Sequence, residues 1–147
     1  ASLHTNDAVS AVLRLRDMEV PPYLISATLL GVMAQRLVRR NCQECLAPAP
    51  DMDPEIRKEL GLNGDEPFYR SAGCPACGNR GYHGRLLVPE VLSADSEVRD
   101  AINADVTYQE LRRLARSKGL ATLTENALTL AQQGQTSLEE AFTVRLD

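Results

Sequence analysis

Residues 39–48 read "RRNCQECLAP" and residues 73–84 read "GCPACGNRGYHG". Each stretch contains a C-x2-C pair, formed by Cys42 and Cys45 in the first and by Cys74 and Cys77 in the second. A tight turn lets both sulfurs of such a pair reach one atom, and two pairs supply the four thiolates that structural zinc prefers. Glycines beside the second pair let backbone amides approach the sulfurs. The spacing therefore predicts a structural zinc site that organises the chain between and around the pairs.

Other uses of the four cysteines remain as alternatives. A thioredoxin-like redox pair needs only one C-x2-C motif in a βαβ context, and disulfides are typical of exported chains, for which this sequence shows no signal. An iron–sulfur site or buried free cysteines are the other possibilities. A catalytic zinc is disfavoured, because four cysteines leave no open position for water. His83 is close to the second pair and could replace a ligand, but the complete tetrad favours a solvated loop residue.

Composition and charge narrow the class of protein. The chain has 147 residues, 44% of them hydrophobic, and a formal net charge of −4, which fits one medium domain or two small ones. It shows no apolar run of membrane-spanning length and no secretory pattern, so we expect a cytoplasmic location. The acidic balance argues against nucleic acid as a partner. Basic residues near the cysteines are interpreted as offsetting the −2 charge of a zinc tetrathiolate; they are Arg39, Arg40, Arg80 and Arg85.

The first half of the chain has both helix and strand patterns. Residues 6–18 predict an amphipathic helix capped by Asn6 or Asp7. Residues 22–40 predict a second helix, buried on most sides, whose last turns carry arginines that complement the helix dipole. A short helix is expected after Asp53, with Pro54 at its start and Gly61 beyond its end. Residues 68–73 and 84–93 predict short strands, and Pro89 indicates an edge or a bulge in the second.

The tail predicts about four short helices, beginning with the segment "ADSEVRDAI". Three T-x-x-E spacings predict capping boxes, at Thr107 with Glu110, Thr122 with Glu125, and Thr136 with Glu139. Gly119 and Gly134 fall where helices should end. Six leucines are candidates for a core shared by these helices: Leu111, Leu114, Leu123, Leu128, Leu130 and Leu138.

The N-terminal stretch "SLHTND" gathers polar groups. Ser2 and Leu3 are interpreted as the end of a strand, and His4 leads into the first helix. Ligands gather at the carboxyl ends of strands in open α/β sheets, so His4 could reach a phosphate or a nucleophilic water. A purely structural histidine before a helix cap is the alternative.

Three motifs in order resemble one protein family. The stretch from "SLHTND" to "NCQEC", then "GCPACGNRGYHGR" with "EVL", and finally "QGQTSLEEAF" are similar to the secretion ATPases of the type II secretion and type IV pilus-assembly family. The resemblance covers nearly the whole chain. The tetracysteine favours the type II secretion and pilus-extension branch over the retraction motors, which generally lack it.

This resemblance implies an α+β, mostly α, fold in three parts. Residues 1–40 would be the end of a RecA-like ATPase core, residues 41–91 a zinc-binding subdomain with short strands, and residues 92–147 a C-terminal helical bundle. The second histidine of the family's His box, near the nucleotide γ-phosphate, matches His4. The family also implies a cytoplasmic hexamer, peripheral at the inner membrane, that couples ATP hydrolysis to pilus or pseudopilus assembly and contacts an inner-membrane platform and adaptor proteins.

Departures from the family pattern limit what the chain could do alone. Ser2 stands where the family usually has threonine, and "GRLLVPEVL" replaces a sequence more like "GRTGIYEVL". The chain has no G-x4-G-K-[ST] segment to hold phosphates, so ATP and magnesium are expected only in a longer parent protein. We therefore expect a C-terminal fragment without activity of its own. An independent zinc-ribbon module that binds nucleic acid or a protein partner is the alternative.

Overall fold

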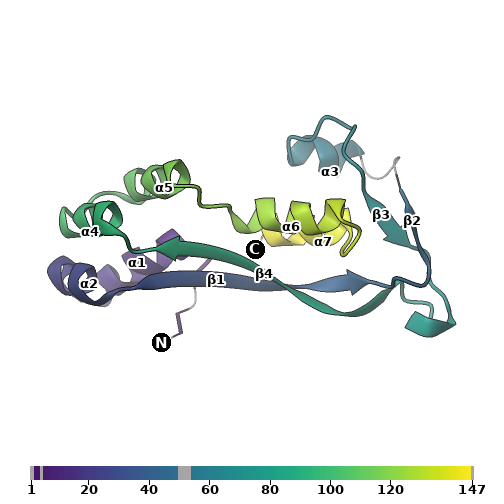
Figure 1. Ribbon diagram of the computed structural model, residues 1–147, viewed down its shortest axis with the longest axis horizontal. Helices are drawn as coiled ribbons and strands as arrows, with labels where there is room; N and C mark the ends of the chain where they lie inside the picture. Colours follow the sequence, from purple (N-terminus) through teal and green to yellow (C-terminus); the bar gives the residue numbers. More distant parts are fainter. Residues whose placement is uncertain (1, 4, 50–53, 147) are drawn as a thin grey trace. The chain divides into compact units, whose positions relative to one another are not determined.

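The computed structural model describes residues 2–3, 5–49 and 54–146, and its architecture is α+β (Figure 1). The elements of the described residues are, in order, α1 (Ala8–Asp17), α2 (Pro22–Thr28), β1 (Gly31–Asn41), β2 (Leu46–Pro48), α3 (Pro54–Glu59), β3 (Tyr69–Ser71), the 3-10 turn η1 (Pro75–Cys77), β4 (Tyr82–Ser93), α4 (Ser96–Asn103), α5 (Tyr108–Ser117), α6 (Leu123–Gln132) and α7 (Leu138–Leu146). None of the helices found there has the length and apolar character needed to cross a membrane.

The chain forms two compact units, and each unit combines two separate parts of the sequence. Residues 1–35 and 89–122 form the first unit, and residues 36–88 and 123–147 form the second. The strands β1 and β4 pair with each other, and each contributes residues to both units. The six leucines proposed as one core are divided accordingly, since Leu111 and Leu114 belong to the first unit and the other four to the second.

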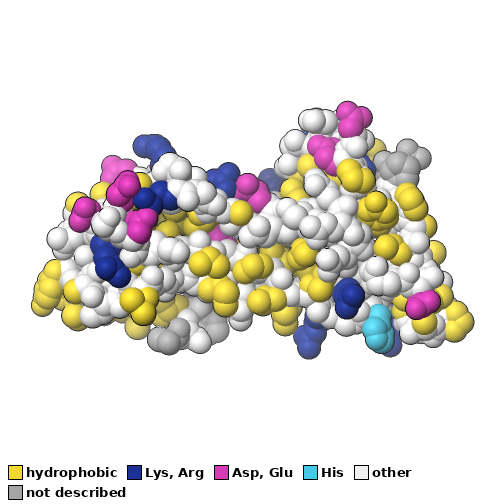
Figure 2. Space-filling view, in the orientation of Figure 1, with side chains coloured by type: hydrophobic (Ala, Val, Ile, Leu, Met, Phe, Trp, Pro, Cys, Tyr) yellow, Lys and Arg dark blue, Asp and Glu magenta, His cyan; other side chains and the backbone are white. Residues whose placement is uncertain are grey.

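Four helices pack together in the first unit. Helix α2 packs against α4, and α1 packs against α5. The predicted N-cap of α1 is confirmed, because Oδ1 of Asp7 accepts a hydrogen bond from the Ser10 amide at 2.6 Å. Acidic and basic side chains lie interspersed over α4 and α5 (Figure 2). The interior contains six fully buried aliphatic side chains: Val9, Val12, Ile25, Val98, Ile102 and Leu111.

The helix predicted over 22–40 is wrong beyond Thr28. The helix α2 ends there, and residues 31–41 form strand β1. Ala34 and Val38 are buried, whereas Met33 and Leu37 are exposed, so the side chains alternate with the two-residue period of a strand. The wide spread of apolar positions that suggests a buried helix is therefore a strand pattern. Consequently the arginines at its end do not complement a helix dipole.

The second unit joins short strands to the last two helices. Strands β2 and β3 are antiparallel, with Leu46 opposite Ser71 and Pro48 opposite Tyr69. Helix α7 packs against α6 and α3. The predicted strand at 84–93 is confirmed and starts earlier, at Tyr82. The core includes Val38, Phe68, Val88, Ala127 and Leu138.

The predicted helix ends of the tail are confirmed at one capping box and two glycines, whereas the box of Thr122 and Glu125 stays a prediction. The capping box of Thr107 and Glu110 is present, and Gly119 and Gly134 have positive φ angles of 94° and 80° beyond α5 and α6. The third box is wrong by one residue. Ser137, not Thr136, accepts the hydrogen bond of the first turn of α7, from the Glu140 amide at 3.2 Å.

Two predictions concern the N-terminal stretch and the start of α3. Ser2 and Leu3 are not in a strand, so the expected strand end is wrong for these described residues. His4 and Asp53 lie outside the described residues. The helix α3 does begin at Pro54, as predicted, and Gly61 follows its end with a φ angle of 69°.

Candidate metal centre

The four cysteine sulfurs meet in the second unit. Sγ of Cys42 lies 3.8 Å from Sγ of Cys74, Sγ of Cys45 lies 4.0 Å from Sγ of Cys77, and the two sulfurs of the second pair are 3.9 Å apart. All four sulfurs lie within 4.8 Å of one another. Cys42 and Cys77 are buried, and Cys45 and Cys74 are partly exposed. The structure thus brings together all four residues that the spacing predicts.

This arrangement fits a tetrahedral zinc ion. Four sulfurs, each about 2.3 Å from a central zinc, would be about 3.8 Å apart. The three separations of 3.8–4.0 Å are close to that value, and all other pairs lie within 4.8 Å. Thiolates are soft ligands that suit zinc, and a set of four leaves no position for a catalytic water. Cys42, Cys45, Cys74 and Cys77 would therefore hold a structural ion, which would supply folding free energy rather than reaction chemistry.

The backbone around the second pair is arranged toward the sulfurs. The turn η1 places Cys74 and Cys77 one turn apart, and Gly78 ends it in the left-handed region with φ of 60°. Amides donate to the sulfurs from Gly73 to Cys45 at 3.4 Å and from Gly81 to Cys77 at 3.2 Å. The expectation that glycine amides approach the sulfurs is confirmed.

Two of these glycines have no room for a side chain. A Cβ on Gly73 would lie 2.9 Å from the Asn79 carbonyl oxygen, and a Cβ on Gly81 would lie 2.5 Å from the Ser71 carbonyl oxygen. Both residues also have positive φ angles, of 110° and 81°. The close approach of the backbone to the sulfurs therefore depends on glycine at both positions.

The electrostatics of the sulfurs differ within the cluster. Burial raises the pKa of the Cys45 thiol, to about 11, against the opposing effect of the Gly73 amide. At Cys77 burial acts in the same direction, but the amides of Cys74 and Gly81 favour the thiolate and lower its pKa to about 6. The hydrogen-bonded backbone thus stabilises negative charge at Cys77.

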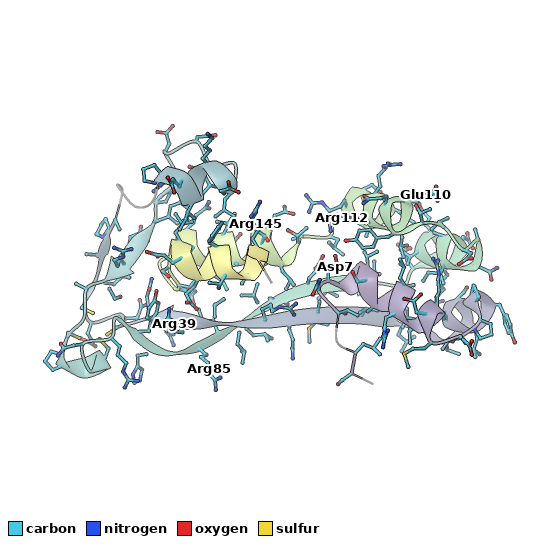
Figure 3. The ribbon with its side chains drawn as sticks, turned by 180° about the vertical axis from the view of Figure 1, so that it is seen from behind. Asp7, Arg39, Arg85, Glu110, Arg112 and Arg145 are labelled. Carbon is cyan, nitrogen blue, oxygen red and sulfur yellow. The ribbon has the colours of Figure 1, made fainter. Side chains whose placement is uncertain are left out.

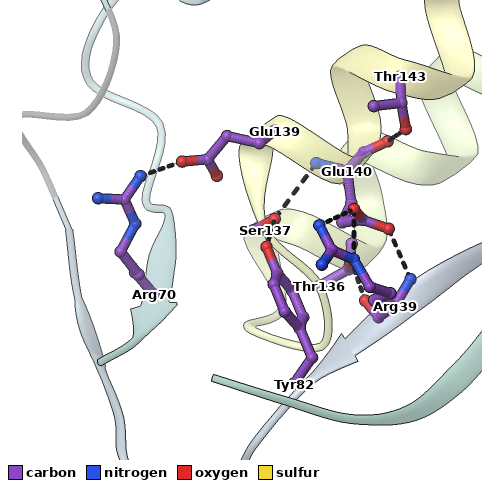
Figure 4. A network of polar contacts seen from close by, with 8 residues as sticks. All are labelled: Arg39, Arg70, Tyr82, Thr136, Ser137, Glu139, Glu140 and Thr143. Carbon is purple, nitrogen blue, oxygen red and sulfur yellow. Dashed lines mark hydrogen bonds and ion pairs between the residues drawn. The ribbon is translucent and has the colours of Figure 1, made fainter. Parts of the chain in front are cut away.

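A polar network ties the strands beside the cluster to α7 (Figure 4). The carboxylate of Glu140 accepts from the Arg39 amide at 2.7 Å and from Arg39 Nε at 2.9 Å. The Tyr82 and Ser137 hydroxyls are hydrogen-bonded at 2.7 Å. The Thr136 hydroxyl donates to the Arg39 carbonyl at 2.6 Å. Arg39 therefore has a carboxylate partner of its own, and its role as counter-charge to the metal site stays a prediction.

Cys42 and the residue before it are anchored by distant parts of the chain. The Cys42 amide donates to the Gly81 carbonyl at 3.0 Å, and the Ser71 hydroxyl donates to the Cys42 carbonyl at 2.6 Å. Asn41, which precedes Cys42, is 1% exposed, and its amide donates to the Gln135 carbonyl at 2.8 Å. These contacts span long sequence separations, so the spacing of the cysteines alone gives no sign of them.

Histidine does not take part in the described cluster. His83 is exposed on β4, in agreement with its interpretation as a solvated residue, although it lies in a strand and not in a loop. The metal cluster found among the described residues consists of cysteines alone.

Comparison with known proteins identifies close relatives over nearly the whole chain. The chain is 46% identical over 146 residues to the type IV pilus assembly ATPase PilB of Thermus thermophilus, an alignment that covers 97% of this chain and 16% of that protein. It is 42% identical over 146 residues to the type II secretion system ATPase E of Vibrio cholerae, covering 98% of this chain and 29% of the relative. The chain thus spans less than a third of the length of either relative.

A solved structure shares the fold. The pilus retraction motor PilT with bound ADP matches with a TM-score of 0.59 at 20% sequence identity, over 99% of this chain and 31% of that one. The expected α+β fold is therefore shared with part of that retraction motor. The family model described as "Type II/IV secretion system protein" matches residues 1–143. The chain belongs to this family of type II and type IV secretion system proteins.

Proposed function

We propose that this chain serves as the zinc-binding part of a secretion ATPase, in which a structural zinc ion at the four cysteines fixes the fold of the second unit. The observation that carries the proposal is the convergence of four sulfurs within 4.8 Å of one another, with separations that suit tetrahedral coordination. The family membership provides the setting in which such a site would act.

The activity proposed for the whole protein is ATP hydrolysis coupled to the assembly of a pilus or pseudopilus. Two relatives are named as ATPases of pilus assembly and of type II secretion, which supports this proposal. ATP and magnesium would bind elsewhere in that protein, because the P-loop sequence is not in this chain. His4 is proposed as the His-box residue near the γ-phosphate. A cytoplasmic hexamer that acts on an inner-membrane platform completes the proposal.

The zinc ion would stabilise a part of the chain with short strands and few core residues. Strands β2 and β3 have three residues each, and their pairing alone would be marginal. Metal binding to a site of this kind contributes directly to folding free energy. Loss of zinc should therefore disorder β2, β3 and η1 first.

Metal analysis of the purified chain tests the zinc site. We expect one zinc ion per chain by atomic emission, and four free thiols that react with a thiol reagent only after denaturation with a chelator. The variant Cys45→Ser should lose the metal, whereas Cys45→His, which keeps a zinc-binding nitrogen at a partly exposed position, should retain more of it. Disulfides in place of thiols, or metal retained by Cys45→Ser, would refute the proposal.

A further inference from the structure

We propose that a basic hollow beside the cysteine cluster binds a phosphate group. The hollow has a volume of about 460 Å³ and is lined by Arg39, Arg80, Tyr82, Gly84 and Arg85. No carboxylate is among these lining residues. In a chain with a net charge of −4, a hollow lined by three arginines is a local reversal of charge.

One wall of the hollow is held rigid before any ligand arrives. The guanidinium of Arg39 lies 4.1 Å from the centre of the Tyr82 ring and is bound by Glu140 through Nε and Nη2. The Tyr82 hydroxyl is in turn held by Ser137. Glu140 occupies one edge of the Arg39 fork, which leaves Nη1 for an anion. A donor fixed in this way loses little conformational entropy on binding.

Two further arginines line the hollow. Arg80 and Arg85 have no acidic partner among the described residues, and Arg85 is exposed. Figure 3 shows Arg39 on β1 and Arg85 on the neighbouring strand β4. The space beside Gly84, another lining residue, is open, because a Cβ there would meet no atom within 4 Å. The three arginines and Glu140 together have a net charge of +2, and a zinc tetrathiolate, whose cysteines do not line the hollow, would add −2 nearby.

This charge and geometry select phosphate. Arginine forks bind phosphate oxygens through paired, charge-assisted hydrogen bonds. A phosphate monoester carries a charge of about −1.5 to −2 at neutral pH, which complements the hollow. The group could belong to a lipid headgroup or to a free phosphate ion. Both sources share the chemistry that the hollow recognises.

Two probes separate these sources, both applied to the full zinc-loaded chain. Inorganic pyrophosphate is titrated by calorimetry, and sedimentation is measured with phosphatidylcholine vesicles that contain or lack phosphatidic acid, whose headgroup is a phosphate monoester. Two test variants each remove one positive charge from the lining of the hollow: Arg80→Gln and Arg85→Gln. The matched control is Arg40→Gln, which removes the same charge from an exposed neighbour of Arg39 that does not line the hollow.

We expect at least one probe to bind, and Arg85→Gln to bind it about tenfold more weakly, as the loss of one charge-assisted contact implies. Arg40→Gln should change affinity by less than about twofold, since an exposed charge outside the site is screened by salt. Pyrophosphate binding assigns a free phosphate, and binding to anionic vesicles alone assigns a headgroup. Zinc content is measured for each variant. If Arg80→Gln loses its metal, the affinity of Arg85→Gln alone is used to test the proposal. Failure of both probes to bind, or equal weakening by Arg40→Gln and Arg85→Gln, overturns the proposal.

Discussion

Arg39 binds both oxygens of the Glu140 carboxylate, with its backbone amide on Oε2 at 2.7 Å and its Nε on Oε1 at 2.9 Å. The Glu140 side chain is only 10% exposed, whereas that of Arg39 is 60% exposed. One carboxylate therefore satisfies a donor of strand β1 and a side-chain charge at once. This contact joins positions that are 101 residues apart in the sequence.

Replacement of Glu140 by alanine should destabilise the second unit. It leaves the Arg39 amide without its acceptor in a partly buried place, which costs about 1–3 kcal/mol. Urea unfolding followed by circular dichroism measures the change. The adjacent Glu139, which pairs with the half-exposed Arg70, provides the control. Glu139→Ala should cost less than about 1 kcal/mol, because exposed ion pairs contribute little. Equal losses for the two variants would contradict the importance of the Arg39 contact.

The variant Gly81→Ala should weaken metal binding. Its Cβ would lie 2.5 Å from the Ser71 carbonyl oxygen, so the backbone must shift, and with it the amide that donates to Cys77. Competition with a chromophoric zinc chelator measures the affinity, which we expect to fall at least about tenfold through loss of an outer-shell hydrogen bond.

Gly84→Ala is the matched control for this prediction. Gly84 has the same φ of 81° as Gly81, but a Cβ there would meet no atom within 4 Å. Both variants incur the cost of a positive φ angle, and only Gly81→Ala incurs the clash. A similar loss of zinc affinity in both variants would contradict the prediction. It would show that the positive φ angle, and not the close approach of Gly81 to the Ser71 carbonyl oxygen, determines the zinc affinity.

Glu90 should make the first unit less stable as the pH rises. The residue is 2% exposed, and burial together with the negative charge of Asp7 raises its pKa. The folded state thus binds a proton more tightly than the unfolded state does. The contribution of Glu90 to stability is therefore fully present below the unfolded pKa of about 4.3 and is lost as the pH rises through the folded pKa. Glu90→Gln should remove this fall and be the more stable protein at neutral pH.

Urea unfolding at several pH values between about pH 5 and 8, above the ordinary pKa of a glutamate, checks the sign of the effect. Asp7, whose carboxylate accepts from Tyr108 and lies near Arg112, does not interfere in this range (Figure 3). Burial opposes its ionisation, but hydrogen bonds from Tyr108 and Ser10 lower its pKa, so its contribution is lost only in more acidic solution. Glu97→Gln, at an exposed position, is the control. Parallel pH profiles for wild type and Glu90→Gln would disprove the effect.

Truncation of Phe68 should cost more than any of these changes. Its side chain is 1% exposed and lies beneath the Arg57 guanidinium, which is 4.8 Å from the ring centre. Phe68→Ala should lower the free energy of unfolding by about 3–5 kcal/mol through lost burial and a cavity. Tyr23→Ala, at a side chain that is 68% exposed, should change it by less than about 0.5 kcal/mol. Thermal unfolding of both variants makes the comparison, and a small loss for Phe68→Ala would mean that this site collapses around the deletion.

Local signals in the sequence predict much of the fold and of the metal site. The paired C-x2-C spacing predicts the four sulfurs, and Asp7, Thr107 and Gly119 mark helix ends where the structure has them. These features depend on residues a few positions apart. Their physical basis is the satisfaction of nearby backbone groups, which a sequence shows directly.

The sequence-based predictions are wrong where residues distant in the sequence determine the local structure. Residues 31–41 form a strand because β4, some fifty residues later, supplies its hydrogen-bonding partner. The cap of α7 falls on Ser137 and not on Thr136, because the Thr136 hydroxyl is taken by the Arg39 carbonyl. Glu140 as the partner of Arg39, and Glu90 beside Asp7, likewise depend on pairings that no short window of sequence contains.

The division of the chain into two units has a consequence for protein engineering. The chain passes from one unit to the other three times, after residues 35, 88 and 122. A single cut or a single stop codon therefore cannot release either unit as an uninterrupted polypeptide. Residues 36–88 expressed alone would lack α6 and α7, which complete their unit. To isolate the second unit, a designer would have to splice 36–88 to 123–147 by a new linker, and recombination between related genes would have to exchange both pieces together.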